Sequence, residues 1–345
     1  MAEEPSERAT LWAVARRAGV HAATASRALN EATRPLVAPD TIARVLRAAR
    51  DLNYHPNHAA RSLRTQRSMT IGVVIPDITN SLFPPIVRGI EDFLAPAGYV
   101  ALVANTGRDV DRERVVMREM LARSVEGIVL ATARRDYPLL EEPPLRGLPV
   151  VLVNRVTDDA LFSSVSTDDR LGARLAVAHL LDLGHRRIAH IAGPDSLSTG
   201  FGRKSGYLEG MRSAGVSAPA SLLVAADSYA EEEGYRCASE LLGRRSPFTA
   251  ILAANDMLAL GALRALDEHG FRCPEDYSLV GFNDMPLVDR ITPPLTTIRL
   301  PQYEAGSEAA RLLLDRIRQR DGPVSAVLLA PKLVVRRSTC PPTPV

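Results

Sequence analysis

The chain is predicted to fold as an all-α head containing a helix-turn-helix, followed by a two-lobed α/β body with parallel sheets. The first observation is a glycine corner, Gly19, between two short helical patterns near the N-terminus. The second is that short apolar runs alternate with helical stretches from Thr70 onward. The third is charge: residues 1–70 hold eleven arginines and six acidic residues, although the net charge of the 345-residue chain is only +2. Basic residues at one end are typical of a nucleic-acid-binding head, or of a solvated basic arm.

Three short helices are predicted for the head, which spans residues 8–56. The first ends at Gly19, where a glycine can take a positive φ and turn the chain without steric cost. The third runs from Pro39 to Leu52. The inward-facing apolar residues of the three helices are, in order, Leu11, Val14, Ala15 and Ala18; Val20, Ala25, Ala28 and Leu29; and Ile42, Val45, Leu46, Ala49 and Leu52. This arrangement predicts a helix-turn-helix unit.

The outer face of the second helix is short and consists of small or polar residues, which fits entry into a DNA major groove. The candidate contact residues are His21, Ala22, Ala23, Thr24, Ser26, Arg27 and Asn30. Small side chains allow close approach, hydroxyl groups reach phosphates, and Arg27 can reach a base edge, most often that of guanine. An ordinary helical hairpin would also have a polar outer face, so the turn alone does not exclude it.

Residues 57–68 are predicted to form a hinge helix between head and body. Pro56 prevents the third helix from continuing, and Asn57 can cap a new helix. The new helix would be shorter than the ~12–15 residues needed for marginal stability alone. It carries arginines and one large aliphatic residue, Leu63, so it fits a segment that folds on DNA and inserts Leu63 into the minor groove. The candidate hinge contacts are Asn57, Ala60, Arg61 and Leu63.

The body is predicted from apolar runs rich in β-branched residues, at residues 70–77, 99–106, 127–132, 150–155, 187–194, 249–256 and 277–284. Such runs alternating with helices indicate parallel strands covered on both faces. A helix near Gln302–Gln319 and two late strands follow. Two such halves make a two-lobed body.

Polar residues follow the predicted strands at the points where they end. They are Asp77, Asn105, Thr106, Asn154, Arg155, Asn255, Asp256, Asn283 and Asp284. Because open parallel sheets bind ligands beyond the carboxyl ends of their strands, we expect a cleft lined with amides, carboxylates and hydroxyls. Such groups suit a hydroxylated ring, although about half of these residues are expected to serve only as helix caps.

Composition and motifs exclude several classes of protein. The chain has no apolar run of membrane length and no secretory signal, so we expect a cytoplasmic protein without a membrane partner. The three cysteines and seven histidines show no metal-ligand spacing, so no metal and no cofactor are expected. Phosphate-loop, nucleophile-elbow and metalloprotease motifs are absent, so an enzyme is not expected.

The sequence closely resembles the LacI/GalR family of bacterial transcription regulators. The matching runs, in order from about Thr10 to Thr339, are VARRAGVHAATASRALN, DLNYHPNHAARSLRTQRS, IGVVIPDITNSLF, LGHRRIAHIAGP, AILAANDMLALGALRAL, SLVGFND and PPLTTIRLPQYEAG. The resemblance implies a periplasmic-binding-protein-like body at residues 69–340. It implies an N-lobe of about 69–166 and 299–330, and a C-lobe of about 167–298 and 331–340, with three crossings between them.

The resemblance implies a repressor that binds double-stranded operator DNA and responds to a small-molecule effector. A homodimer on a palindromic operator is expected, because one head contacts too little DNA for useful specificity. The effector residues that the resemblance or the strand ends imply are Asn80, Leu82, Phe83, Asn154, Thr199, Arg203, Tyr229, Asn255 and Asn283. Arg203 is expected to pair with a ligand oxygen. A periplasmic-type sugar receptor without a DNA role is the alternative, but it should lack the basic head.

The sequence departs from the family pattern at several positions. The usual serine that caps the recognition helix is His21, and loss of a cap costs about 1 kcal/mol, so a less stable head is expected. The main specificity positions fall on Ala22 and Ala23, which offer only apolar contact. In the cleft, the effector aspartate is Asn283, and an arginine of many sugar-binding relatives is Phe201. A sugar effector is favoured over a nucleobase or nucleoside.

Overall fold

The head is held together by the small, buried side chains of three short helices. In the computed structural model, which describes residues 9–30, 33–54, 67–142, 145–244, 246–320 and 322–343, these helices are α1 (Leu11–Ala18), α2 (Ala22–Leu29) and α3 (Pro39–Asp51), with a 3₁₀ turn at Arg34–Leu36. Gly19 ends α1 with φ of 64°, and its N–H bonds the last carbonyls of that helix. The head and body are separate units, Met1–Ser68 and Met69–Val345.

The core of the head differs from the expected one in α3. Val14, Ala15, Ala25, Ala28 and Val45 are almost completely buried, as the apolar pattern predicted. In α3, however, Ala48 is buried and the predicted inward residues Ile42, Leu46 and Leu52 are only partly covered, because the small helices α1 and α2 cannot cover a wide face.

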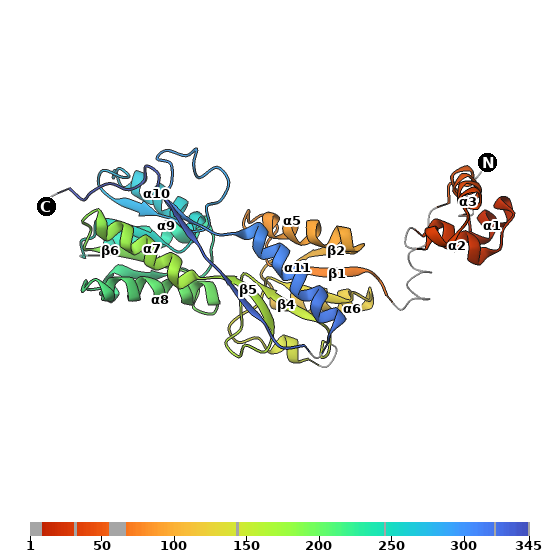
Figure 1. Cartoon of the computed structure of the whole chain (residues 1–345). Helices are drawn as coiled ribbons and strands as arrows, with labels where there is room; N and C mark the ends of the chain where they lie inside the picture. The colour runs from red at the N-terminus through yellow and green to blue at the C-terminus, as the bar shows by residue number, and fades with distance from the viewer. Residues whose placement is uncertain are drawn as a thin grey trace, which may run out of the picture. The chain divides into compact units, whose positions relative to one another are not determined.

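The N-lobe is built on a parallel sheet (Figure 1). In the described part of the chain its strand order is β11-β5-β4-β3-β1-β2. The strands are β1 (Thr70–Ile75), β2 (Val100–Asn105), β3 (Gly127–Leu130), β4 (Val150–Val153), β5 (Ser163–Thr167) and β11 (Ala326–Leu329). Helices α5 (Phe83–Leu94) and α11 (Gln302–Arg318) cover one face, and α6 (Val110–Ala122) covers the other.

The C-lobe repeats this three-layer design with a parallel sheet in the order β7-β6-β8-β9. The strands are β6 (Ile188–Ala192), β7 (Leu223–Ala225), β8 (Ala250–Ala253) and β9 (Ser278–Val280). Helices α7 (Asp169–Asp182) and α8 (Ser198–Ser213) lie on one face, and α9 (Glu231–Gly243) and α10 (Asp256–Glu268) lie on the other. Strands β10 (Thr297–Arg299) and β12 (Lys332–Val334) pair antiparallel where the chain crosses between lobes.

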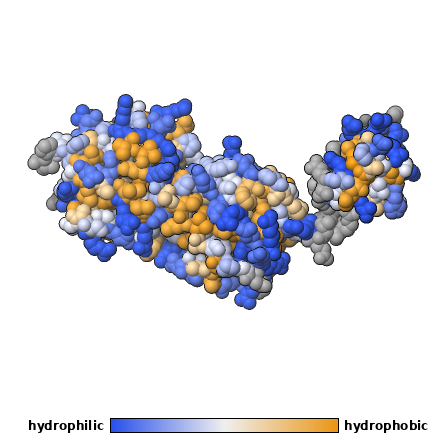
Figure 2. Space-filling model, viewed as in Figure 1, coloured by the Kyte–Doolittle hydropathy of each residue, from blue (hydrophilic) through white to orange (hydrophobic). Residues whose placement is uncertain are grey.

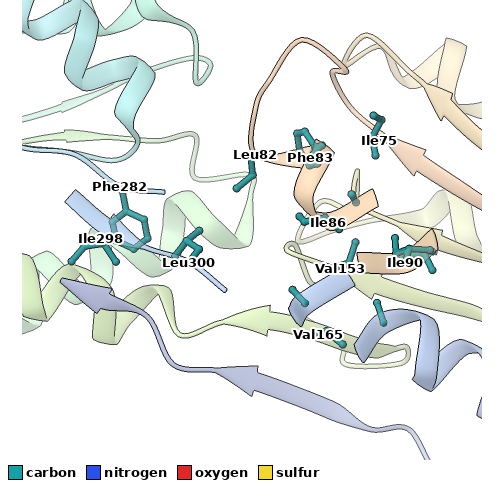
Figure 3. Close-up of a cluster of buried hydrophobic side chains, with 14 of the residues drawn as sticks. Ile75, Leu82, Phe83, Ile86, Ile90, Val153, Val165, Phe282, Ile298 and Leu300 are labelled. Carbon is teal, nitrogen blue, oxygen red and sulfur yellow. The ribbon is translucent and has the colours of Figure 1, made fainter. Parts of the chain in front are cut away.

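One apolar core joins the two lobes. It includes Ile75, Phe83 and Ile90 of the N-lobe together with Phe282 and Ile298 of the C-lobe (Figure 3). This shared core places the carboxyl ends of the two sheets on opposite sides of one cleft.

The fold class is the predicted one, but strands β5, β7 and β10 were missed. Strand β5 has the polar sequence SSVST and lies inside the sheet, where Ser163 Oγ accepts a hydrogen bond from the N–H of Ser325. Strand β7 has three residues and lies at the sheet edge. Neither has the long β-branched run by which buried strands are recognised. None of the helices in the described ranges has the length and apolar character needed to cross a bilayer.

Candidate DNA-contacting face and effector cavity

Helix α2 presents the predicted DNA-contacting residues on one side and its core residues on the other. His21, Ala23 and Arg27 are exposed, and Ala25 and Ala28 are buried against α1 and α3. The remaining predicted residues, which are partly exposed, are Ala22, Thr24, Ser26 and Asn30. The hinge contacts predicted at Asn57, Ala60, Arg61 and Leu63 lie outside the described residues.

His21 caps α2, so the expectation that the helix had lost its cap was wrong. Its Nδ1 accepts a hydrogen bond from the N–H of Ala23 over 3.2 Å. The imidazole therefore satisfies one of the unpaired N–H groups of the first turn, as a serine hydroxyl would. Trp12 lies edge-on to this ring, with centroids 6.4 Å apart. Ala38, the N-cap residue of α3, makes no side-chain capping bond.

The C-terminal end of α2 is held by a turn that the sequence did not reveal. Thr33 donates from Oγ1 to the carbonyl of Arg27 over 3.1 Å, and Arg34 donates from Nε to the carbonyl of Ala28 over 3.1 Å. These bonds satisfy carbonyls that a helix end leaves unpaired. They fix the part of the helix from which Arg27 projects.

In the body, all nine predicted effector residues line one small cavity between the lobes. These residues are Asn80, Leu82, Phe83, Asn154, Thr199, Arg203, Tyr229, Asn255 and Asn283, and Arg155 joins them. The cavity has about 20 Å³, which is room for one water molecule. We refer to it as the inner cavity. Arg155 is among the polar residues at the strand ends, but it was not predicted as an effector residue, because the direction of its side chain depends on the fold.

Some amides of the inner cavity also have structural bonds. Asn255 caps α10, with Oδ1 accepting from the N–H of Leu258 over 2.8 Å. Asn80 Oδ1 accepts from the N–H of Leu82 over 3.0 Å. In contrast, Asn283 Oδ1 is buried and has no partner among the described residues. Part of the strand-end set therefore serves as caps, and part remains available to a ligand.

Arg203 is held within the protein. Its Nε donates to Asp169 Oδ1 over 2.7 Å, and its Nη1 donates to the carbonyl of Ala254 over 2.6 Å. Phe282 lies against the guanidinium, whose carbon is 4.0 Å from the ring centroid. Burial raises the pKa of Asp169, and the charge of Arg203 opposes that rise. Arg203 thus lines the inner cavity with a fixed orientation, and two of its nitrogens already have partners.

Tyr229 closes another side of the inner cavity. Its hydroxyl lies 3.0 Å from Thr199 Oγ1, and burial raises the pKa of the phenol. A Cβ atom at Gly193 would lie 2.5 Å from the Tyr229 hydroxyl oxygen, so this ring position requires a glycine there. The ring is available for stacking on a ligand.

A larger cavity of about 510 Å³ adjoins the inner one and shares Asn80, Phe83, Arg155 and Tyr229 with it. Its volume falls within the ~300–1,000 Å³ typical of small-molecule sites. Leu197 also lines this larger cavity. Phe201 lines neither cavity and packs under Arg135, whose guanidinium carbon is 3.9 Å from its ring centroid.

Glu113 forms a buried polar cluster on the N-lobe wall of the larger cavity. Thr132 and Tyr137 both donate to its Oε1, and burial raises the pKa of the carboxyl group. Asp77 and Arg108, also on this wall, form an ion pair at 2.7 Å. Within the described ranges, no group of three or more His, Cys, Asp or Glu residues is placed to hold a metal ion.

Comparison with known proteins adds three findings. Residues 10–57 match the family model of bacterial regulatory proteins of the lacI family, and residues 177–339 match that of the periplasmic binding protein-like domain. The ribose operon repressor of Halalkalibacterium halodurans is 34% identical over 330 residues, covering 96% of this chain and 97% of that protein.

Two solved structures resemble the chain over nearly its whole length. The lac repressor dimer bound to operator and the anti-inducer ONPF gives a TM-score of 0.87 at 29% identity, covering 97% of this chain and 100% of that chain. The complex of the transcriptional regulator CelR with cellobiose gives a TM-score of 0.73 at 32% identity, covering 96% of this chain and 100% of that chain.

Proposed function

The chain belongs to the lacI family of bacterial regulatory proteins, and on that premise we propose that it is a repressor that binds a palindromic operator as a homodimer under the control of a sugar effector. It is a transcriptional regulator with a DNA-binding head and an effector-binding body. Chromosomal DNA as the target places its action in the bacterial cytoplasm, and no catalytic role is proposed.

The observation that carries the proposal is the joint presence of a capped, exposed recognition helix and a cavity between two lobes. His21 and Arg27 are exposed on α2, whose two ends are fixed by His21 and by the Thr33–Arg34 turn. A rigid helix end loses little conformational entropy when it enters a major groove. The hinge contacts at Asn57, Ala60, Arg61 and Leu63 remain part of the proposal.

A dimer supplies two such heads to two half-sites. The lac repressor, which this chain resembles, was solved as an operator-bound dimer. Large apolar residues such as Val100 and Leu328 are exposed on the body, and Figure 2 shows apolar patches among the hydrophilic ones on one face. Singly exposed apolar residues are common, so the oligomeric state should be measured directly by analytical ultracentrifugation.

A sugar is the preferred effector class because the linings of the two adjoining cavities combine amides, threonine hydroxyls and aromatic rings, which suit a hydroxylated ring. The ribose operon repressor and the CelR–cellobiose complex among the similar proteins support this choice. A nucleobase or nucleoside is the second candidate.

The decisive experiment is selection of bound duplexes from a random DNA pool by the full-length protein. An enriched inverted repeat is expected, with half-sites separated by about one helical turn. Gel-shift titration of that repeat should then respond to one class of sugar. Recovery of no common motif, together with tight sugar binding, would instead favour the sugar-receptor alternative.

A further inference from the structure

Arg155 lies at the meeting point of the two cavities and forms no ion pair with the residues that the structure describes. It follows Asn154 at the end of β4 and lines both cavities. Its Nε is buried, and its guanidinium makes no hydrogen bond or ion pair with any residue that the structure describes. Burial lowers its pKa to about 10, so the group still carries its charge at neutral pH. A buried guanidinium without a partner is costly.

The lining of the inner cavity holds two guanidiniums, Arg155 and Arg203, and no carboxylate. Asp169, just outside the lining, pairs with Arg203 and neutralises it. The polar residues that remain are amides and hydroxyls, including Asn154 and Asn283. The inner cavity therefore has a net positive charge, and that charge is at Arg155.

Nearby acidic residues do not remove this imbalance. Glu113 acts on Arg155 electrostatically but forms no ion pair with it, and it also faces Arg134, which likewise has no ion pair within the described chain. The single carboxyl group of Glu113 thus interacts electrostatically with two guanidinium groups and can balance the charge of only one of them. The acidic residues on the C-lobe side, such as Glu231 and Glu232, line only the larger cavity, at the first turn of α9, and Glu231 already pairs with Arg264.

We propose that the effector is a polyhydroxylated anion in the larger cavity, with its sugar-like part against the shared residues Asn80, Phe83 and Tyr229 and its carboxylate or phosphate on Arg155. This inference rests on the proposed function and narrows its effector class. A neutral sugar leaves Arg155 without a counter-charge, whereas an acid supplies one through a charge-assisted, bidentate contact. The larger cavity, at about 510 Å³, has room for both the ring and its acidic group.

The test compares ring sugars that differ only in the acidic group, by calorimetry on the full-length protein. The series are D-glucose, D-glucuronate and D-glucose 6-phosphate; D-galactose, D-galacturonate and D-galactose 6-phosphate; and D-ribose with D-ribose 5-phosphate. In at least one series, an acid should bind about 10- to 100-fold more tightly than its neutral parent. The uronate and phosphate arms distinguish a carboxylate from a phosphate.

Two variants test the assigned residue. Arg155→Gln keeps hydrogen-bonding groups but removes the charge, so the acid should lose its advantage over the neutral parent. Asn154→Asp places a carboxylate in the inner cavity, at a left-handed position (φ of 66°) that aspartate tolerates. It should weaken binding of the acid and leave neutral sugars as the better ligands. Arg88→Gln, at an exposed arginine outside both cavities, is the matched control.

The inference is wrong if neutral sugars bind as tightly as their acids, or if the acid keeps its advantage in Arg155→Gln. If neutral sugars bind and alter operator affinity, the proposed function stands and only this inference fails. If the protein binds its operator and no member of any series binds, control by a sugar effector is wrong as well.

Discussion

Arg203 and Asp169, on neighbouring helices α8 and α7, form a buried ion pair with 2.7 Å between Nε and Oδ1. Side-chain exposure is 3% for the arginine and 11% for the aspartate. The bond fixes one wall of the inner cavity and gives Arg203 a structural role beside its predicted contact with the effector.

Removing only one partner of this pair should destabilise the body. Arg203→Ala leaves the carboxylate of Asp169 buried without compensation, so the free energy of unfolding should fall by about 3–5 kcal/mol. Combining Arg203→Ala with Asp169→Ala should cost less than the sum of the two single variants, because neither charge is then left buried alone. Urea unfolding followed by far-UV circular dichroism measures both. A double variant as unstable as the sum of its single variants would show that the two side chains do not interact.

His190 should make the stability of the C-lobe fall in acid. It is fully buried, stacks on Tyr207 with centroids 4.8 Å apart, and lies with Nδ1 2.8 Å from the carbonyl of Leu252. Burial lowers its pKa to about 4, from 6.5. The unfolded chain therefore takes up the proton first, and stability present above about pH 6.5 is lost as the pH falls towards 4.

At pH 5 this linkage amounts to about 2 kcal/mol for His190. The loss of unfolding free energy between pH 7.5 and pH 5 should be smaller in His190→Phe by that amount. His269→Phe, at an exposed histidine, is the control. An identical loss in wild type and His190→Phe would mean that His190 is protonated in the folded protein.

The cap at His21 should stabilise the head. His21→Ala removes the acceptor for the N–H of Ala23 and should cost about 1 kcal/mol, whereas His21→Ser should retain most of the stability. Trp12, the single tryptophan of the chain, is close enough to His21 for its fluorescence to report unfolding of the head. Arg47→Ala, at an exposed residue of α3, serves as the control. Equal stability of His21→Ala and wild type would mean that the bond contributes nothing.

Operator affinity should depend steeply on salt. About 6–10 phosphate contacts by arginines of the two heads and hinges predict a loss of roughly 10³–10⁵ in affinity between 50 and 200 mM salt. Fluorescence anisotropy on the selected operator measures this slope. Arg61→Gln should reduce the slope of the logarithm of affinity against the logarithm of salt concentration by about one for each phosphate that the arginine neutralises. The body variant Arg88→Gln should not change this slope. An operator affinity that does not change with salt concentration would show that the basic segment does not contact DNA phosphates.

The sequence by itself determined the fold class, because that class depends on patterns between residues close in the chain. The corner at Gly19 depends on a glycine tolerating φ of 64°, and the strand–helix alternation depends on local apolar runs. The resemblance to relatives and the polar strand ends then selected nine residues that line one cavity. Where the local pattern was weak, as in the polar strand β5, the strand was missed.

Only the tertiary structure decided which side chains have partners. Asp169 and Arg203 are far apart in sequence and meet because α7 packs on α8, so no local pattern predicts their bond. The same packing neutralises Arg203 and leaves Arg155, which also lines the cavity, without an ion pair among the described residues. The sequence gives the sign of each side-chain charge. The free energy of that charge in the folded protein depends on its desolvation and on the nearest opposite charge, and both are set by the fold.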